Sequence, residues 1–308
     1  APPNSRLPMS FDHLVNQHEF RVFAMKRSGH HAVIAWLMRH FSGSIYFLNN
    51  CSYHSEILFS STRVGRVFHH LPAADPPGFG GRVSIFLEQG QIVHQTEHLT
   101  KTELVDDPLA RLDRLIAGET ALHQSLEVAD ARDAYLFNLE DFPLSESSTI
   151  PFDAAARGVS ETIHNVIVLR DPYNWLASRY RGQFPIDETV IEAWCSHCRE
   201  ALRETASLSN PLVVNYDRWF TDPAYRQELS DQAELPGEEP GIGEMTNFGG
   251  GSSFTGLEFR NQAKRMDVLH RWKHFEDDSQ FRDLFSRYPQ MADYADRLFP
   301  QSEKPSFL

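Results

Sequence analysis

Two short basic segments of the chain carry residue types that bind anions. The first is Lys26-Arg27-Ser28-Gly29-His30-His31-Ala32, in which two cations precede a hydroxyl residue and a glycine. The second begins at Arg170-Asp171-Pro172 and is followed by Ser178, eight residues after the arginine. Guanidinium and ammonium groups bind phosphate and sulfate groups, and hydroxyl and backbone N–H groups add hydrogen bonds. The two segments together indicate a ligand with two separated anionic groups.

The sequence around the first segment predicts a strand, a turn and a helix. The apolar run from Arg21 to Met25 is typical of a buried strand, and apolar residues recur at helical spacing from His30 until Gly43. A helix that begins directly after such a turn points free N–H groups and the positive end of its dipole at one place. We therefore expect an anion site there, with an ordinary capped β–α turn as the alternative.

The second segment has the same predicted setting. It follows the clearest strand pattern of the chain, His164 to Leu169, and precedes a helix predicted from Tyr173 to Arg181 with Pro172 in its first turn. In open α/β sheets, ligands collect beyond the carboxyl ends of the strands. We expect both basic turns to open on that edge, where one ligand would reach both.

Strand and helix patterns alternate along the whole chain. Further strands are predicted at 44–48, 82–88, 134–139 and 211–216, and further helices at 107–128, 188–207 and from 257 to about 298. This alternation predicts an α/β fold with a central parallel β-sheet flanked by helices on both faces. We expect one domain over residues 1–308, with an N-terminal segment at 1–18. Two long loops, 60–81 and 236–256, are rich in Gly or Pro and are candidate lids.

The net charge and the length of the apolar runs argue against two classes of protein, nucleic-acid binders and membrane-spanning proteins. The formal net charge of −13 argues against a nucleic-acid binder, which would carry a basic face, and more weakly against a highly anionic acceptor. The chain contains no run of about 18 apolar residues, so no membrane span is predicted.

The three cysteines are too few for a disulfide framework, and a reducing compartment, the cytoplasm, is expected. Cys195 and Cys198 form a lone C-x-x-C without a second pair, which favours helix packing over a zinc site. The first residues lack an initiator Met and an apolar signal core, so the N-terminus is interpreted as trimmed, and a preceding anchor stays an alternative.

The two basic motifs resemble those of the sulfotransferases that use phosphoadenosine phosphosulfate (PAPS). Arg27-Ser28-Gly29-His30-His31 is similar to the first family signature, and Val166 to Tyr180, with Arg170 and Ser178, matches the second. Asn215 to Pro223 and Arg271-Trp272 look like two later stretches of the family. The chain departs from the family at His30 and His31, where Thr or Ser is preferred; an imidazole N–H replaces the hydroxyl donor there.

The resemblance implies a P-loop-like phosphosulfate-binding turn and sulfuryl transfer from PAPS to a hydroxyl or amine, without a metal. Arg27 would stabilise the leaving group, and the ribose phosphate would be held by Arg170 and Ser178. The glycine-rich segment would close over that phosphate. The cofactor residues so implied are Lys26, Arg27, Ser28, Gly29, His30, His31, Ala32, Arg170, Ser178, Gly250, Ser252, Ser253 and Arg260. For Arg260, as for Lys264 and Arg265, a solvated helix face is the alternative.

A general base must take the proton of the acceptor. Family members use a Glu or a His whose position varies between subfamilies, and the comparable places here are occupied by Glu140, Glu56 and His54. Glu88 and His94 are weaker candidates. The alternative for each is an exposed carboxylate or a capped strand end.

Two other functions stay open. A P-loop kinase would need the string G-x-x-x-x-G-K-[ST], which the chain lacks. A non-catalytic nucleotide-binding protein of the same fold would bind the cofactor without transferring sulfate. The acceptor is not encoded in a readable motif; the acidic composition favours a small molecule over a glycan.

Overall fold

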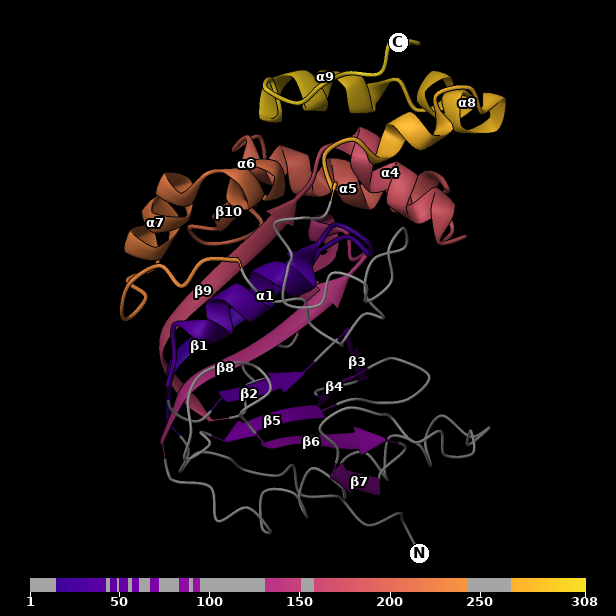
Figure 1. The fold of residues 1–308 in the computed structure, drawn as a ribbon. Coiled ribbons are helices and arrows are strands. Elements are labelled where there is room, and N and C mark those ends of the chain that lie inside the picture. Colours follow the sequence, from indigo (N-terminus) through magenta and orange to yellow (C-terminus); the bar gives the residue numbers. More distant parts are fainter. Residues whose placement is uncertain are drawn as a thin grey trace, which may run out of the picture.

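The computed structural model describes residues 15–42, 45–48, 50–54, 57–60, 67–71, 83–88, 91–94, 131–150, 158–242 and 267–308. Within them an eight-stranded sheet has the order β10-β9-β1-β8-β2-β5-β6-β7 (Figure 1). Its strands are β1 (Val15–Ala24), β2 (Ile45–Leu48), β5 (Val67–Leu71), β6 (Val83–Glu88), β7 (Gln91–His94), β8 (Ala131–Glu140), β9 (Val159–Leu169) and β10 (Leu212–Asn215). From β10 to β2 neighbouring strands are parallel, whereas β5, β6 and β7 are added antiparallel. The predicted α/β fold is confirmed.

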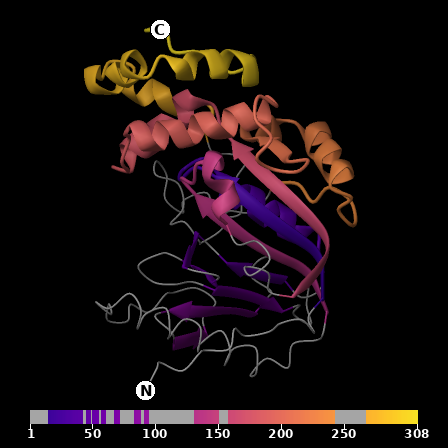
Figure 2. The same cartoon turned by 180° about the vertical axis from the view of Figure 1, so that it is seen from behind.

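Helices cover both faces of the parallel strands (Figures 1 and 2). One face packs on α1 (His30–Arg39), α6 (Tyr216–Thr221) and α7 (Pro223–Gln232). The other packs on α4 (Pro172–Arg181) and α5 (Glu188–Ala201), with α8 (Ser279–Arg287) and α9 (Gln290–Leu298) beyond them. In β1 the side chains alternate between the two cores, with Val22 and Ala24 facing α1 and Phe23 facing α4 and α5.

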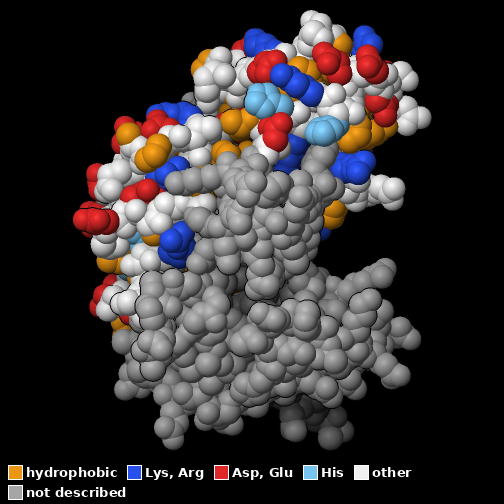
Figure 3. Space-filling model, in the orientation of Figure 1, with side chains coloured by type: hydrophobic (Ala, Val, Ile, Leu, Met, Phe, Trp, Pro, Cys, Tyr) orange, Lys and Arg blue, Asp and Glu red, His pale blue; other side chains and the backbone are white. Residues whose placement is uncertain are grey.

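Among the helices that the structure describes, none combines the length and the apolar character needed to cross a membrane. Over the described upper part of the face in Figure 3, acidic and basic side chains are interspersed and not separated by sign.

The predicted irregular loop at 60–81 is wrong for its middle, because residues 67–71 form β5, which pairs with β2. The polar stretch after β2 forms a hairpin of β3 (Cys51–His54) and β4 (Ile57–Ser60). Turn residues on both sides of β5 dominate the sequence pattern, and the pairing of this short segment with β2 and β6 makes it a strand.

Other boundaries differ where tertiary contacts extend or end an element. β1 and β9 begin earlier than predicted because they pair along their full lengths, with Val15 opposite Val159. α5 ends at Ala201, and the final helical region is divided into a 3₁₀ helix (Arg271–Phe275), α8 and α9. The helix predicted at 107–128, residues 257–266 and the greater part of the 236–256 loop lie outside the described residues.

Gly29, between β1 and α1, has a backbone conformation and a neighbour that exclude a side chain. Its φ of 87° is in the left-handed region. A Cβ on this residue would lie 2.3 Å from a ring carbon of Tyr216, closer than real Cβ contacts come. Tyr216 begins α6 at the end of β10, so the turn and the α6 N-terminus fit together only with glycine here.

Gly29→Ala is expected to lower the free energy of unfolding more than Gly237→Ala does. Both glycines have positive φ, 87° and 78°, but a Cβ on Gly237 meets nothing within 4 Å. We expect a loss of about 1 kcal/mol for Gly237→Ala from the backbone, and about 3 kcal/mol for Gly29→Ala because overpacking adds to it. Urea unfolding measures both, and equal losses would contradict the role of Tyr216.

Candidate functional site

The turn between β1 and α1 is fixed by the end of β8 and by α4. The Lys26 carbonyl oxygen accepts hydrogen bonds from Trp175 Nε1 at 3.0 Å and from Arg179 at 3.3 Å. The Lys26 N–H donates to the Asp141 carboxylate at 2.9 Å, and Arg179 donates to the same carboxylate at 2.8 Å. Three side chains from two segments therefore hold the Lys26 peptide at the start of the turn.

The backbone of the turn leaves donors for a ligand. Arg27 has a φ of 70°. The N–H of Ser28 donates to Met25 and that of Ala32 donates to Gly29. Within the part of the chain that the structure describes, the N–H groups of Gly29 and His30 have no acceptor. These N–H groups lie at the positive end of the α1 dipole, as an anion site requires.

The two basic turns predicted from the sequence lie side by side. Arg170 donates from Nη1 to the Arg27 carbonyl oxygen at 3.4 Å and to Ser178 Oγ at 3.3 Å, and from Nη2 to the Val268 carbonyl oxygen. Its guanidinium carbon is 5.1 Å from the centre of the Tyr216 ring. Arg271 Nη1 also donates to Ser178 Oγ, at 2.9 Å. Arg170 and Arg271 therefore converge on the Ser178 hydroxyl, and Arg170 joins it to the turn at Arg27. We call Arg27, Arg170 and Arg271 the arginine cluster.

The arginine cluster concentrates positive charge in a buried place. Burial, followed by the charges of Arg170 and Arg27, lowers the pKa of Arg271 to about 9. Burial and the charge of Arg170 also lower the pKa of Arg27. Buried like charges destabilise one another unless an opposite charge is brought to them. A bound anion would supply that charge.

A buried carboxyl pair, Asp171 and Asp217, supplies only part of this negative charge. Asp217 accepts a hydrogen bond from Ser302 at 2.8 Å, and Asp171 caps α4 at the N–H of Asn174. Burial, with the charge of Asp171, raises the pKa of Asp217 well above its usual range. This shift favours the neutral form of Asp217, which carries no charge to offset that of the arginine cluster.

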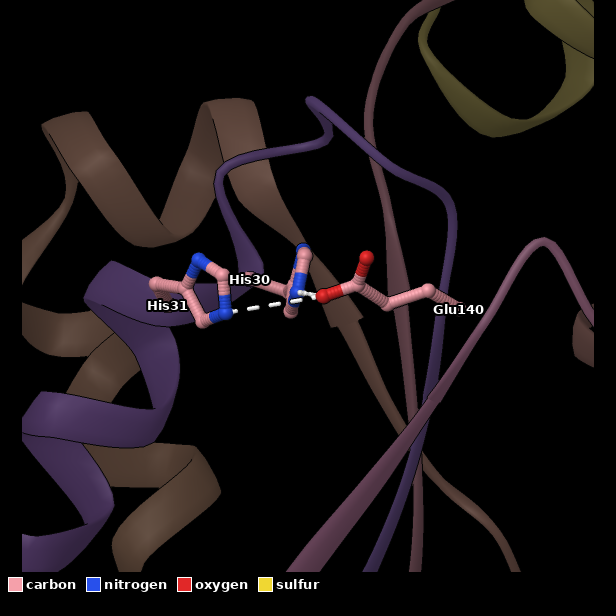
Figure 4. A group of neighbouring side chains, drawn as sticks. All are labelled: His30, His31 and Glu140. Carbon is pink, nitrogen blue, oxygen red and sulfur yellow. Dashed lines mark hydrogen bonds and ion pairs between the residues drawn. The ribbon is translucent and has the colours of Figure 1, made fainter. Parts of the chain in front are cut away.

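A second cluster of chemical groups lies at the start of α1 (Figure 4). Glu140 Oε1, at the end of β8, is 3.0 Å from His30 Nε2 and 3.5 Å from His31 Nε2. Asn138 Nδ2 donates to the same oxygen at 3.2 Å, and Asn138 Oδ1 accepts from the N–H of Asn50. We call His30, His31 and Glu140 the His–Glu cluster.

The His–Glu cluster keeps its carboxylate ionised. Burial raises the pKa of Glu140, but the hydrogen bond from His30 and the charges of His30, His31 and Lys26 outweigh it and bring the pKa to about 2. A carboxylate of this kind is a weak base at neutral pH. Glu140 therefore fits the role of orienting the imidazoles better than that of taking a proton itself.

Two other chemistries use residue types that this cluster contains. Its three ligand atoms lie within 4.8 Å of one another, so a metal ion could bind there, although the charges of Lys26 and Arg27 act on the same carboxylate and oppose a cation. Ser28 Oγ is 3.4 Å from His30 Nδ1, which completes the residue types of a hydrolase triad. However, Ser28 is only 1% exposed and is not positioned to attack a substrate.

The structure brings together the predicted residues Lys26 to Ala32, Glu140, Arg170 and Ser178. His54 belongs to β3, but its side chain lies outside the described residues, as do those of Glu88 and His94. Glu56, Gly250, Ser252, Ser253 and Arg260 also lie outside them. The prediction that Cys195 and Cys198 pack in a helix is confirmed: both are buried in α5, and burial raises the pKa of Cys195 to about 11.

Several residues of the site escaped the sequence analysis. Asp141 and Arg179 hold the turn, and Tyr216 packs on Gly29 and Arg170. The sequence places Arg271 in an Arg-Trp motif but gives it no role in binding a ribose phosphate. The C-terminal position of this motif gave no sign that Arg271 would reach Ser178, 93 residues earlier.

Comparison with known proteins adds no assignment to this geometry. No family model matches the chain, and no similar protein was found among curated proteins or solved structures. The features that bear on function are therefore the β1–α1 turn, the arginine cluster and the His–Glu cluster.

Glu140→Gln is expected to change the acid dependence of stability. Because the folded-state pKa of about 2 is below the ordinary value of 4.5, the ionised carboxylate stabilises the fold above pH 4.5 and loses that contribution as the pH falls toward 2. We expect the variant to be less stable by about 3 kcal/mol at neutral pH, a difference that shrinks in acid. Denaturant unfolding from pH 7 to pH 3 measures it. Glu192→Gln, at an exposed carboxylate, is the control, and an unchanged difference across the range would contradict the account.

Proposed function

We propose that the protein is a PAPS-dependent sulfotransferase. The observation that carries the proposal is the convergence of Arg170 and Arg271 on Ser178, where Arg170 also contacts the backbone of Arg27 in the β1–α1 turn. Two anion-binding places then lie next to each other, one at the N-terminus of α1 and one at Ser178. A nucleotide with a 5′-phosphosulfate and a phosphate on its ribose has anionic groups for both.

The roles of the residues follow from this placement. Lys26, Arg27 and the N–H groups of the turn hold the phosphosulfate and stabilise the charge that develops on the leaving phosphate. Arg170, Arg271 and Ser178 hold the ribose phosphate. At present the Val268 carbonyl oxygen accepts from Arg170 Nη2, where a phosphate oxygen would bind, so binding includes a shift of the segment that carries Val268.

The reaction is an in-line transfer. The oxygen or nitrogen of the acceptor forms a bond to sulfur, the bond between sulfur and the phosphate oxygen breaks, and phosphoadenosine phosphate leaves with the electron pair. A base takes the proton of the acceptor. Positioning and charge stabilisation supply the rate enhancement, by analogy with phosphoryl transfer. A small-molecule acceptor, a metal-free site and a cytoplasmic location complete the proposal.

A thermal-shift panel tests the nucleotide assignment. Phosphoadenosine phosphate is expected to raise the melting temperature, with or without a chelator, because it stabilises the native state by mass action. Magnesium-dependent stabilisation by ATP alone would favour a kinase instead. Sulfate transfer from radiolabelled PAPS to a mixture of a phenol, a sugar alcohol and an alkylamine then separates an enzyme from a non-catalytic binder.

Two arginine variants are expected to separate turnover from binding. Arg27→Ala should reduce turnover by about 100-fold or more, because it removes a cation at the leaving group. Arg170→Ala should mainly weaken the binding of phosphoadenosine phosphate, by about 10- to 100-fold, as expected for loss of a charge-assisted contact. Arg287→Ala, at an exposed arginine of α8, is the control. Unchanged turnover and affinity in both variants would contradict the assignment.

A further inference from the structure

We propose that Asn174 is the positioning residue of the ribose-phosphate site, an inference that rests on the proposed sulfotransferase activity. Asn174 lies in the first turn of α4, and its buried side chain holds the backbone of Leu269 and Arg271. These bonds fix the point from which the Arg271 guanidinium reaches Ser178 Oγ. Asn174 therefore acts on the nucleotide through Arg271.

The two ends of the Asn174 amide bind different partners. Nδ2 donates to the Leu269 carbonyl oxygen at 2.8 Å and to the Asp171 carboxylate at 3.0 Å, and Oδ1 accepts from the Arg271 N–H at 2.7 Å. Because acceptors face Nδ2 and a donor faces Oδ1, the partners fix the orientation of the amide. Asn174 is only 1% exposed, and loss of hydrogen bonds in such a place leaves polar groups unsatisfied.

The start of α4 fixes Asn174 in turn. Asp171 is the N-cap residue of the helix, and its Oδ1 accepts from the Asn174 N–H at 2.9 Å, while its Oδ2 accepts from Asn174 Nδ2. The Asn174 carbonyl oxygen accepts from Ser178 Oγ at 2.8 Å. This bond uses the hydroxyl proton, so the Ser178 oxygen is an acceptor for the two arginines that donate to it.

Arg271 needs such an anchor because its place is electrostatically unfavourable. Its guanidinium shares Ser178 Oγ with that of Arg170, and burial, followed by the charge of Arg170, lowers the pKa of Arg271. Until an anion binds, the like charges repel one another. The segment that leads from Arg271 to α8 lies against α4 (Figure 1), and the bonds of Asn174 to its backbone oppose that repulsion.

The bonds of Asn174 are compatible with a bound phosphate. The Val268 carbonyl oxygen accepts from Arg170 Nη2 and leaves when the phosphate arrives, whereas Leu269 and Arg271 are held by a different side chain. The movement is then limited to the chain before Leu269, and Arg271 is in place beforehand. A cation that is already positioned binds an anion more tightly than one that must first be ordered.

Asn174→Ala tests the role in the full-length protein by titration calorimetry. Its affinity for phosphoadenosine phosphate is expected to fall about tenfold, as for a weakened charge-assisted contact. Its affinity for adenosine 5′-phosphate, which lacks the ribose phosphate, should stay within about twofold. The kcat at saturating PAPS should also change by less than about twofold, because the contacts of the transferred group are kept. Gln227→Ala, at an exposed amide of α7, is the control.

A double-variant cycle connects the effect to Arg271. In an Arg271→Ala background, Asn174→Ala should weaken the binding of phosphoadenosine phosphate no further, because the group that it positions is gone. Asn174→Ser keeps a polar group next to Asp171 but is too short to bridge Leu269 and Arg271. It should show the same pattern, and it replaces Asn174→Ala in the cycle if that variant does not fold.

Other results would overturn the inference and separate its failure from that of the proposed function. Unchanged affinity for phosphoadenosine phosphate in the Asn174 variants, or a multiplicative loss in the double variant, would remove the positioning role. An equal loss of affinity for adenosine 5′-phosphate would show that Asn174 has a general structural role instead. In these cases the unmodified protein still binds phosphoadenosine phosphate. Absence of that binding would overturn the proposed function as well.

Discussion

The arrangement depends on the way in which the Lys26 peptide is held. Its N–H is bound by Asp141 at the end of β8, and its carbonyl oxygen by Trp175 and Arg179 of α4. Arg179 also joins Asp141, so both sides of the peptide are connected through one ion pair. Because Arg27 and Gly29 then take positive φ values, the turn presents its N–H groups and α1 begins directly behind them. Contacts with β8 and α4 thus determine the geometry of the β1–α1 turn.

The local charge at the turn is opposite in sign to the net charge of the chain. The chain as a whole is acidic, with a formal net charge of −13, yet Arg170 and Arg271 meet at Ser178 and Arg170 contacts the backbone of Arg27. Burial and the charge of Asp171 raise the pKa of the neighbouring Asp217, which favours its neutral form over the carboxylate that would offset their charge. The His–Glu cluster lies at the same helix end. There the ionised Glu140 carboxylate is stabilised by His30 and His31. The arginine cluster and the His–Glu cluster therefore lie at the same turn.

The sequence predicted the elements with strong periodicity and the residues in the two basic turns. β1, α1, β9 and α4 were found because each has a buried apolar pattern, and Pro172 and Gly29 lie at their ends. Contacts between distant segments were not predictable. Nothing local to β5 indicates a strand, and nothing local to Arg271 places it on Ser178. Glu140 was selected by its place after a strand, but its ionised state depends on His30 and His31, which only the folded chain brings to it.

The most direct measurement of the central claim is a crystal structure of the protein with phosphoadenosine phosphate. The account predicts one phosphate on the N–H groups of the Lys26–Gly29 turn and the other between Arg170, Arg271 and Ser178. It also predicts that the Val268 carbonyl leaves Arg170 Nη2 when the second phosphate binds. A nucleotide bound elsewhere, or one that contacts the turn without reaching Ser178 and its arginines, would contradict the account.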